Sequence, residues 1–307
     1  MRTGEGAAAG ATVFPLLKNG STSGANGRVR NARAAAGCAA RDSAPAALWI
    51  SKAPRSVRRR RLAAEKGGRV EKEAEAALAS RDWLCWQLAD SAFPTGGFAH
   101  SAGLESAWQH GEVRNREELV SFVNASLQQL GRGALPFVLA VYDEPERAGE
   151  CDRLCEAFTT NPVANRASRV QGKAMLSALA RIFPEIRKAG GQEPGCGSEA
   201  LEPPARHSIC HFAPAFGLCM RRLGVARGTA GRLFFFNHLR GLLAAAVRLN
   251  IVGPMEAQAL QRRLAPSAEA MFERCRGLSL ADIAQTSPLL DLWQGAHDRL
   301  YSRLFQS

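Results

Sequence analysis

The chain has 307 residues and a formal net charge of +12, and 46% of its residues are hydrophobic. This length allows one or two domains with a sizeable core. The charge lies mainly at one end, because residues 1–80 hold 15 Lys and Arg against 6 Asp and Glu, whereas residues 81–307 hold 25 against 22. The near-neutral body gives little support to nucleic acid or a membrane as a partner, so neither is expected.

Residues 1–68 are predicted to form a disordered, basic N-terminal extension. Ala, Gly, Ser and Arg dominate there, and large apolar residues are too few to offset the entropy of ordering the chain. The scarcity of acids is compatible with an organellar targeting peptide, and the run of arginines from Arg58 to Arg61 with a nuclear localisation patch. A solvated tail without a special role remains an equally open alternative.

Residues 69–307 are predicted to form a single all-α, helical-bundle-like domain of roughly ten helices. The first helix runs from an acidic, alanine-rich stretch to the break at Pro94, and a second begins at His100 or Ser101 and ends at Gly111. Asn115 is the expected N-cap of a third, with Glu118 at the spacing of a capping box. This third helix is expected to stop at residues 131–133, where two glycines flank an arginine.

Further helices are predicted at about 134–143 and 148–158, and Asn161 with Pro162 opens a longer basic helix. A Gly- and Pro-rich loop at 190–206 precedes two apolar helices at about 208–223 and 227–250, the second of them central. Three shorter helical segments are expected after Pro254. The sequence contains no alternating runs rich in Val, Ile and Thr, so no strands are predicted.

The longest apolar stretch, residues 233–249, is interrupted by two arginines, an asparagine and a histidine, which indicates a buried helix rather than a membrane span. The eight cysteines form no Cys-x-x-Cys pair, so neither a zinc ribbon nor a thioredoxin-like redox pair is indicated. Several lie in predicted helix interiors, where free thiols behave as small apolar groups. A reducing, cytoplasmic location is the simplest interpretation.

The stretch FPTGGFAHSAGLESA, residues 93–107, raises the question of catalysis, since Ala99 to Gly103 nearly match the Gly-x-Ser-x-Gly nucleophile elbow. That elbow needs a strand before a strained turn, and here a Pro-Thr-Gly-Gly loop precedes it. His100 is a poor base for Ser101, because consecutive side chains diverge. The alternative is that Ser101 or His100 caps the following helix.

Two other motifs suggest ligands. Gly172 and Lys173 are followed by alanine and lack the earlier glycine of a phosphate-binding loop, so a nucleotide is not expected there. His207, Cys210 and His211 lie within one helical turn and would need a fourth metal ligand such as Cys196. Polar residues are common at helix N-termini, so no metal site is predicted. A metal-dependent or serine enzyme using these histidines or the His100/Ser101 pair remains the alternative function.

The terminal stretch HDRLYSRLFQS is expected to end a helix on which apolar residues and arginines cluster. Aromatic side chains and arginine at an exposed chain end are typical anchors of protein interfaces. The alternative is the fraying end of an amphipathic helix packed on its own domain.

Five ordered blocks of sequence resemble the family of urease accessory proteins called UreF. They are QLADSAFPTGGFAHSAGLE (87–105), NPVANRASRVQGKAML (161–176), HFAPAFG (211–217), HLRGLLAAAVRLNIVGPMEAQAL (238–260) and YSRLFQS (301–307). The resemblance covers about residues 81–307, and five blocks in the family's order are far more specific than any one of them.

The resemblance implies an all-helical protein that is commonly a dimer and is not an enzyme. UreF proteins bind a second accessory protein, UreD (also called UreH), and this pair recruits the GTPase UreG. The assembly delivers nickel to apo-urease, so nickel and GTP are handled by partner proteins and no cofactor, metal or catalytic residue is expected in the chain itself.

The resemblance also implies which residues bind partners. The stretch with Phe98, His100 and Ser101 is expected to be a docking surface for UreG, with Phe98 where some members have Tyr. Glu105 matches the acid of the family's Gly-Leu-Glu, and Arg303 its C-terminal arginine. The full set of expected partner-binding residues is Phe98, His100, Ser101, Glu105, Arg166, Lys173, Tyr301, Arg303, Leu304 and Phe305.

Overall fold

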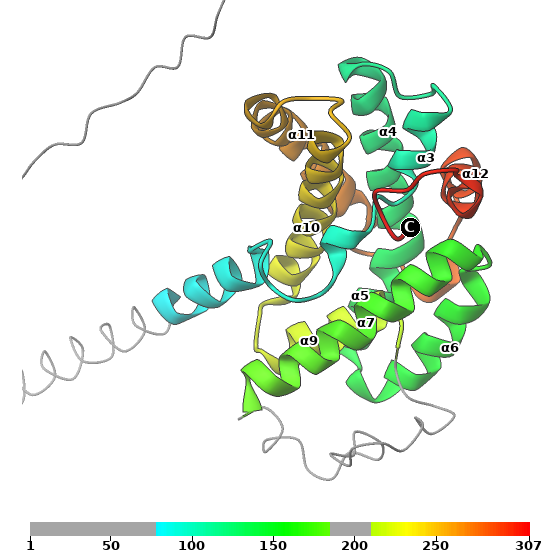
Figure 1. Ribbon diagram of the computed structural model, residues 1–307. Coiled ribbons are helices and arrows are strands. Elements are labelled where there is room, and N and C mark those ends of the chain that lie inside the picture. Colours follow the sequence, from blue (N-terminus) through cyan, green and yellow to red (C-terminus); the bar gives the residue numbers. More distant parts are fainter. Residues whose placement is uncertain (1–77, 185–209) are drawn as a thin grey trace, which may run out of the picture. The chain divides into compact units, whose positions relative to one another are not determined.

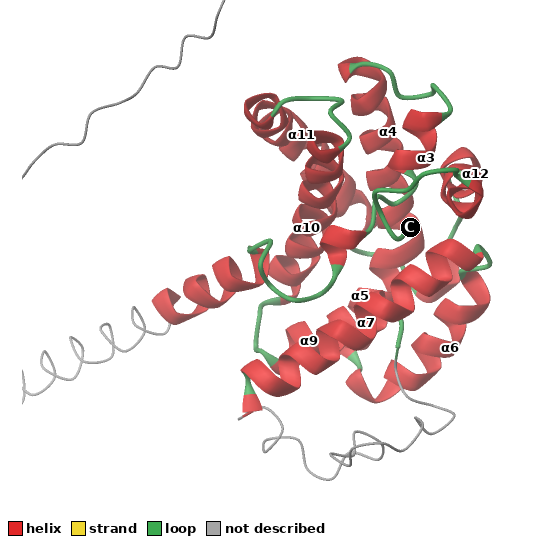
Figure 2. Ribbon diagram, viewed as in Figure 1, coloured by secondary structure: helices red, strands yellow, loops and turns green. Residues whose placement is uncertain are grey.

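The computed structural model describes residues 78–184 and 210–307, and these residues are helical without a strand (Figures 1 and 2). A helical segment occupies residues 78–89. The α-helices that follow it are α3 Leu104–Gln109, α4 Arg116–Gln129, α5 Leu135–Asp143, α6 Ala148–Phe158, α7 Pro162–Ile182, α9 Phe212–Arg222, α10 Arg227–Arg248, α11 Pro254–Cys275 and α12 Pro288–Ala296. The predicted all-α fold is confirmed. The predicted extension, its boundary at residue 68 and the 190–206 loop lie outside the described residues.

Asn115 and Asn161 are the N-caps of α4 and α7, as the sequence predicted. The Asn115 side chain accepts hydrogen bonds from the backbone N–H groups of Glu117 and Glu118, and the Asn161 side chain caps α7 in the same way. Each cap satisfies N–H groups that have no partner within the helix. The predicted capping box is only half formed, because Glu118 accepts instead from the backbone N–H of Arg114 at 2.7 Å.

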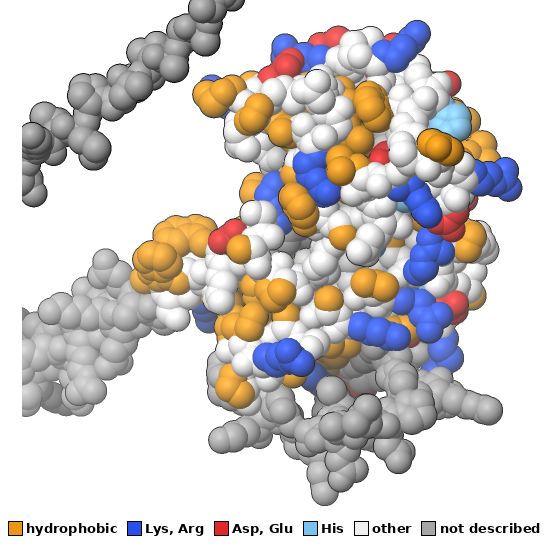
Figure 3. Space-filling view, viewed as in Figure 1, with side chains coloured by type: hydrophobic (Ala, Val, Ile, Leu, Met, Phe, Trp, Pro, Cys, Tyr) orange, Lys and Arg blue, Asp and Glu red, His pale blue; other side chains and the backbone are white. Residues whose placement is uncertain are grey.

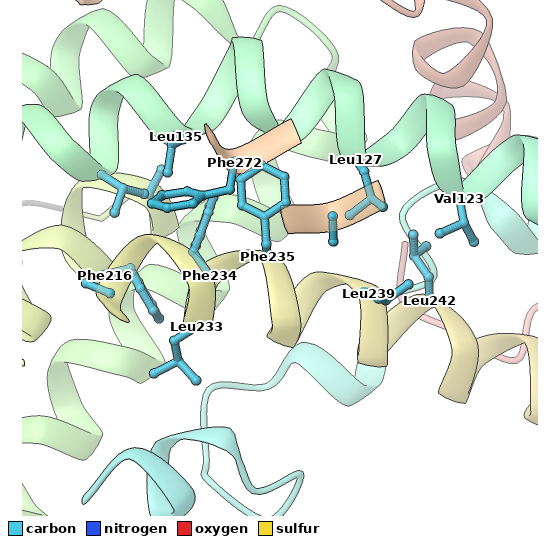
Figure 4. Packing of buried hydrophobic residues seen from close by; sticks show 14 of the residues in the cluster. Val123, Leu127, Leu135, Phe216, Leu233, Phe234, Phe235, Leu239, Leu242 and Phe272 are labelled. Carbon is cyan, nitrogen blue, oxygen red and sulfur yellow. The ribbon is translucent and has the colours of Figure 1, made fainter. Parts of the chain in front are cut away.

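Helix α10 is central, as predicted, and packs against α4, α5, α9 and α11. Its buried residues face the core in Figure 4, where the rings of Phe235 and Phe272 meet edge to face with centroids 6.2 Å apart. A Cβ on Gly231 would lie 2.3 Å from the Phe272 ring, so only glycine permits this approach of α10 and α11. No described helix is long and apolar enough to cross a bilayer.

Four details of the predicted helices are wrong. The third helix does not stop at its glycines, because the π-helical turn Leu130–Ala134 carries α4 directly into α5. The second helix begins at Leu104 rather than at His100 or Ser101. Residues 300–307 contain no helix, and α11, which was expected to be short, spans 22 residues.

Candidate partner-docking surface

The loop before α3 is shaped by glycines. Gly96 has a φ of 75° before the 3-10 turn Gly97–Ala99, and Gly103 has a φ of 86° at the start of α3. A Cβ on Gly103 would lie 3.1 Å from the backbone nitrogen of Gln294 on α12. A positive φ combined with so close a backbone contact favours glycine. This residue therefore lets α12 lie directly against the start of α3.

Residues 300–307, here called the C-terminal segment, fold back along this loop (Figure 1). The backbone N–H of Gln306 donates to Ala99 at 2.8 Å, and that of Ser101 donates to the Ser307 oxygen at 2.6 Å. Farther along α3, the Gln109 side chain donates to the Ser302 carbonyl at 2.9 Å. Because the segment takes its hydrogen bonds from residues about 200 positions earlier, the amphipathic pattern there does not form the predicted helix.

Glu105 is the main polar anchor of the C-terminal segment, and it is only 2% exposed to solvent. One carboxylate oxygen accepts from the backbone N–H of Leu304 at 2.6 Å, and the other from that of Phe305 at 3.1 Å. The second oxygen also lies 3.0 Å from Nε2 of the fully buried His297. A buried carboxylate is tolerated only with such partners, so Glu105 fixes the path of the segment.

Ser101 and His100 hold the last residue in place. The Ser101 hydroxyl donates to the Ser307 oxygen at 3.1 Å, and His100 Nδ1 lies 2.6 Å from the Ser307 hydroxyl. Desolvation, followed by the nearby His297 and Arg166, lowers the pKa of His100 below its usual value. His100 and Ser101 thus both contact Ser307 and not each other, which gives no support to a Ser-His catalytic pair.

Arg248, on α10, joins the loop to the C-terminal segment. Its guanidinium carbon lies 4.1 Å from the ring centroid of Phe98 and 4.0 Å from that of Phe305. It also donates hydrogen bonds to the carbonyls of Phe98 and Leu304. Cation–π contacts of this kind contribute about 0.5–2 kcal/mol each. Arg248 therefore sets the spacing between the exposed ring of Phe98 and the buried ring of Phe305.

The predicted partner-binding residues divide into two groups. Ser101, Glu105 and Phe305 are at most 5% exposed and do not present their side chains to solvent, and His100 is partly buried. The others are exposed: Phe98 at 64%, Leu304 at 52% and Tyr301 completely, together with the charged Arg303, Arg166 and Lys173. The buried residues can therefore affect a partner only by holding the exposed ones in position.

Arg166 on α7 is linked to the C-terminal part of the chain. It donates to Asp298 at 2.8 Å, and Arg303 lies 3.4 Å from the same carboxylate. Lys173 lies farther along α7, where Figure 3 shows Lys and Arg side chains following the helix across this face. The structure thus brings Arg166 and Arg303 together at one acid, with Lys173 on the same helix as Arg166.

A cavity of about 630 Å³ lies beside the loop before α3. It is lined by residues 91–98 and by residues of α7, α9 and α10. His238 lies in its wall and forms a 2.7 Å hydrogen bond with Ser126. Desolvation lowers the pKa of His238 to about 4, so this imidazole is neutral at pH 7. Most of the other lining side chains are apolar or uncharged.

Of the three residues considered as metal ligands, Cys210 and His211 lie at the start of α9 and bind acidic side chains there. His207 lies outside the described residues. The backbone N–H groups of Cys210 and His211 donate to Asp152 at 3.0 and 2.8 Å, and His211 Nε2 lies 2.6 Å from Glu156. Within the described ranges, no group of three or more His, Cys, Asp and Glu side chains could hold a metal ion.

Gly172 and Lys173 occupy the interior of α7 rather than a phosphate-binding loop. A Cβ on Gly172 would lie 2.1 Å from the carbonyl oxygen of Cys210, so the glycine permits the close packing of α7 against the start of α9. The thiols of the described cysteines are free, and burial raises the pKa of Cys155 and Cys219 to about 12. Both thiols are therefore protonated, which agrees with the prediction that they act as small apolar groups.

Sequence reasoning missed two residues that the site depends on. His297 is fully buried against Glu105, and Arg248 bridges the two phenylalanines. Their contacts span 192 and 150 residues, and neither residue stands in a pattern that marks it. The one available indication was that Arg248 interrupts the apolar stretch 233–249, and His297 had no such signal.

Comparison with known proteins places the chain in a family. The family model described as UreF matches residues 113–265. "Urease accessory protein F" of Oryza sativa subsp. japonica is 41% identical over 226 residues, which cover 73% of this chain and 84% of the rice protein. The protein of the same name from Arabidopsis thaliana is 40% identical over 229 residues, covering 73% of this chain and 92% of its own length. The chain therefore belongs to the UreF family of urease accessory proteins.

Proposed function

We propose that this chain is a non-catalytic urease maturation factor. In this proposal it binds a UreD/UreH-type accessory protein and recruits and regulates a UreG-type GTPase, so that nickel is inserted into apo-urease. Nickel is then the cargo and GTP the nucleotide of the partner. Membership of a family named for urease accessory proteins supports this role, and cytoplasmic action is part of the same proposal.

The structure of the C-terminal segment carries the proposal. Its inner side is fixed by Glu105 and Ser101, while its outer side exposes Tyr301, Arg303 and Leu304. An ordered segment loses less conformational entropy on binding than a free tail, so its anchors are available at a lower free-energy cost. Tyrosine and arginine are also the residue types that contribute most at protein interfaces. We therefore assign partner docking to the exposed residues Phe98, Arg166, Tyr301, Arg303 and Leu304, here called the docking surface.

The proposal includes a homodimer, in which a second copy of the chain binds a different surface. In the helical segment 78–89, Leu78, Trp83 and Trp86 are each about 60–70% exposed. The centroids of the two indole rings lie 5.0 Å apart. Its C-terminal end is fixed by side chains of α10, since Asn237 and Arg240 donate to the carbonyls of Leu88 and Ala89. Exposed tryptophans on an anchored helix support the proposed homodimer.

Size-exclusion chromatography with light scattering tests the proposed function. The full chain is mixed with the UreD- and UreG-type proteins of the same organism, with and without GTP. A three-component peak that is lost with Arg303→Ala and kept with Arg262→Ala, an exposed arginine on α11, would support the proposal. A helical, monodisperse chain that forms no complex with either protein would overturn it.

A further inference from the structure

Helix α7 presents a one-signed row of charge to solvent. Its 21 residues include the cations Arg166, Arg169, Lys173 and Arg181 but no Asp or Glu. At 3.6 residues per turn, the four cations project within an arc of about 120°. All four are exposed, and Figure 3 shows the resulting band of Lys and Arg along the helix. We call these four residues the α7 basic stripe.

The α7 basic stripe is only partly neutralised by the rest of the described chain. Arg166 shares Asp298 with Arg303, so one carboxylate faces two guanidinium groups. Arg169 lies 3.9 Å from Glu156, whose closer partner is His211 at 2.6 Å. Within the described residues, Lys173 and Arg181 have no carboxylate at ion-pair distance. The stripe therefore retains a positive charge that an external anion can neutralise.

The spacing of these cations disfavours the helix on its own. Arg166 and Arg169 are three residues apart, and Arg169 and Lys173 are four apart, which makes each pair neighbours on the helix surface. Like charges at these spacings destabilise a helix, whereas opposite charges stabilise it. A bound acidic surface would convert this repulsion into attraction, so the row is better suited to a complex than to the free chain.

We infer that the α7 basic stripe binds an acidic face of a partner protein, such as a helix with Asp and Glu along one side. This inference rests on the proposed function, because Arg166 joins the stripe to Arg303 of the docking surface through Asp298. A partner that contacts Arg303 can therefore continue along α7. Helix α7 spans about 30 Å, which is enough for several turns of an opposing helix.

The composition of α7 favours a protein over other polyanions. Proteins that bind single-stranded nucleic acid combine basic grooves with aromatic side chains on which bases stack, and α7 contains no Phe, Tyr or Trp. A membrane-surface helix would present large apolar side chains for insertion. Between the cations of α7, the exposed apolar residue is the small Val170, at 48%. The stripe therefore offers neither stacking rings nor a large apolar face between its charges.

The test measures binding of the full chain to the UreD- and UreG-type proteins at several salt concentrations. Lys173→Glu with Arg181→Glu reverses two charges that have no ion pair within the described residues. Arg262→Glu with Arg274→Glu on α11 is the matched control, with the same change in net charge on another helix. We expect the α7 variant to bind about tenfold or more weakly at low salt and with a flatter salt dependence, and the control to match the wild type.

The outcomes separate this inference from the proposed function. If the wild-type complex forms and the α7 variant binds with the affinity and salt dependence of the control, the inference is wrong while the proposed function stands. If no complex forms with the wild-type chain, both are wrong. Tighter binding of the wild type than of the α7 variant to a 30-nucleotide single strand or to phosphatidylserine vesicles, without an effect on the protein complex, would also overturn the assignment to an acidic protein.

Discussion

The inner and outer faces of the C-terminal segment are built from opposite kinds of contact. The inner face is at most 5% exposed at Phe305, Ser307 and Glu105, and it depends on hydrogen bonds from two backbone N–H groups to Glu105. The outer face carries Tyr301, Leu304 and Arg303, of which Arg303 makes an exposed ion pair at 3.4 Å. Buried polar contacts are costly to break, whereas exposed ion pairs contribute about 0–1 kcal/mol.

This contrast separates two roles that the family resemblance does not distinguish. Glu105 and Arg303 both match positions of the family resemblance, yet one is buried and the other exposed. Substituting Glu105 should change the structure of the surface, and substituting Arg303 should change only what the surface binds. The predictions below test that separation, from the largest expected effect to the smallest.

Glu105→Ala should have the largest effect, because it removes the acceptor of the Leu304 and Phe305 backbone N–H groups and the partner of buried His297. Each buried polar group left without its hydrogen-bond partner costs about 1–3 kcal/mol. We expect the amides of Leu304 and Phe305 to lose hydrogen-exchange protection and partner recruitment to fail. Normal protection of both amides in the variant would show that Glu105 does not hold the segment.

Acid should destabilise the fold through His238. The folded-state pKa of about 4 lies below the unfolded value of about 6.5, so the folded state binds fewer protons between these pH values. Stability is therefore complete above about pH 6.5 and falls by about 3 kcal/mol as the pH drops to 4. Urea denaturation at several pH values should show a flatter dependence for His238→Gln. His110→Gln, at an exposed histidine, is the control, and an equal slope in both variants would contradict the assignment.

Arg303→Ala should weaken partner binding by about 2 kcal/mol, roughly 30-fold, as expected for an interface arginine. Its exposed pair with Asp298 contributes little to the fold, so the free energy of unfolding should change by less than about 0.5 kcal/mol. Titration calorimetry and urea denaturation measure the two quantities. A loss of stability as large as the loss of affinity would remove the distinction between the two faces.

Phe98→Tyr should have the smallest effect. The ring is 64% exposed and keeps its contact with Arg248, so stability should change by a few tenths of a kcal/mol. A hydroxyl that reaches a group on the partner would add about 0.5–1.5 kcal/mol of affinity. Calorimetry of the variant therefore shows whether phenylalanine at this position lacks a partner contact, and unchanged affinity would show that the ring alone is used.

Most helices could be predicted from local sequence, and the reason is physical. Asn115 and Asn161 cap helices because their side chains reach N–H groups two and three residues ahead, a contact within one turn. The apolar run in α10 likewise predicts burial, since its length and composition leave little polar surface. The boundary at residues 131–133 failed because glycine lowers helix propensity without forbidding a π-helical turn between packed helices.

The sequence by itself determined the helical class, the starts of α4 and α7, the central place of α10 and the family. Only the tertiary structure decided the conformation of the C-terminal segment and which site residues are exposed. Its amphipathic pattern predicted a helix, but Glu105, Ser101 and Ala99 supply hydrogen bonds that a local helix would otherwise provide. These partners lie about 200 residues away, and because such contacts depend on the packing of every intervening helix, no local pattern encodes them.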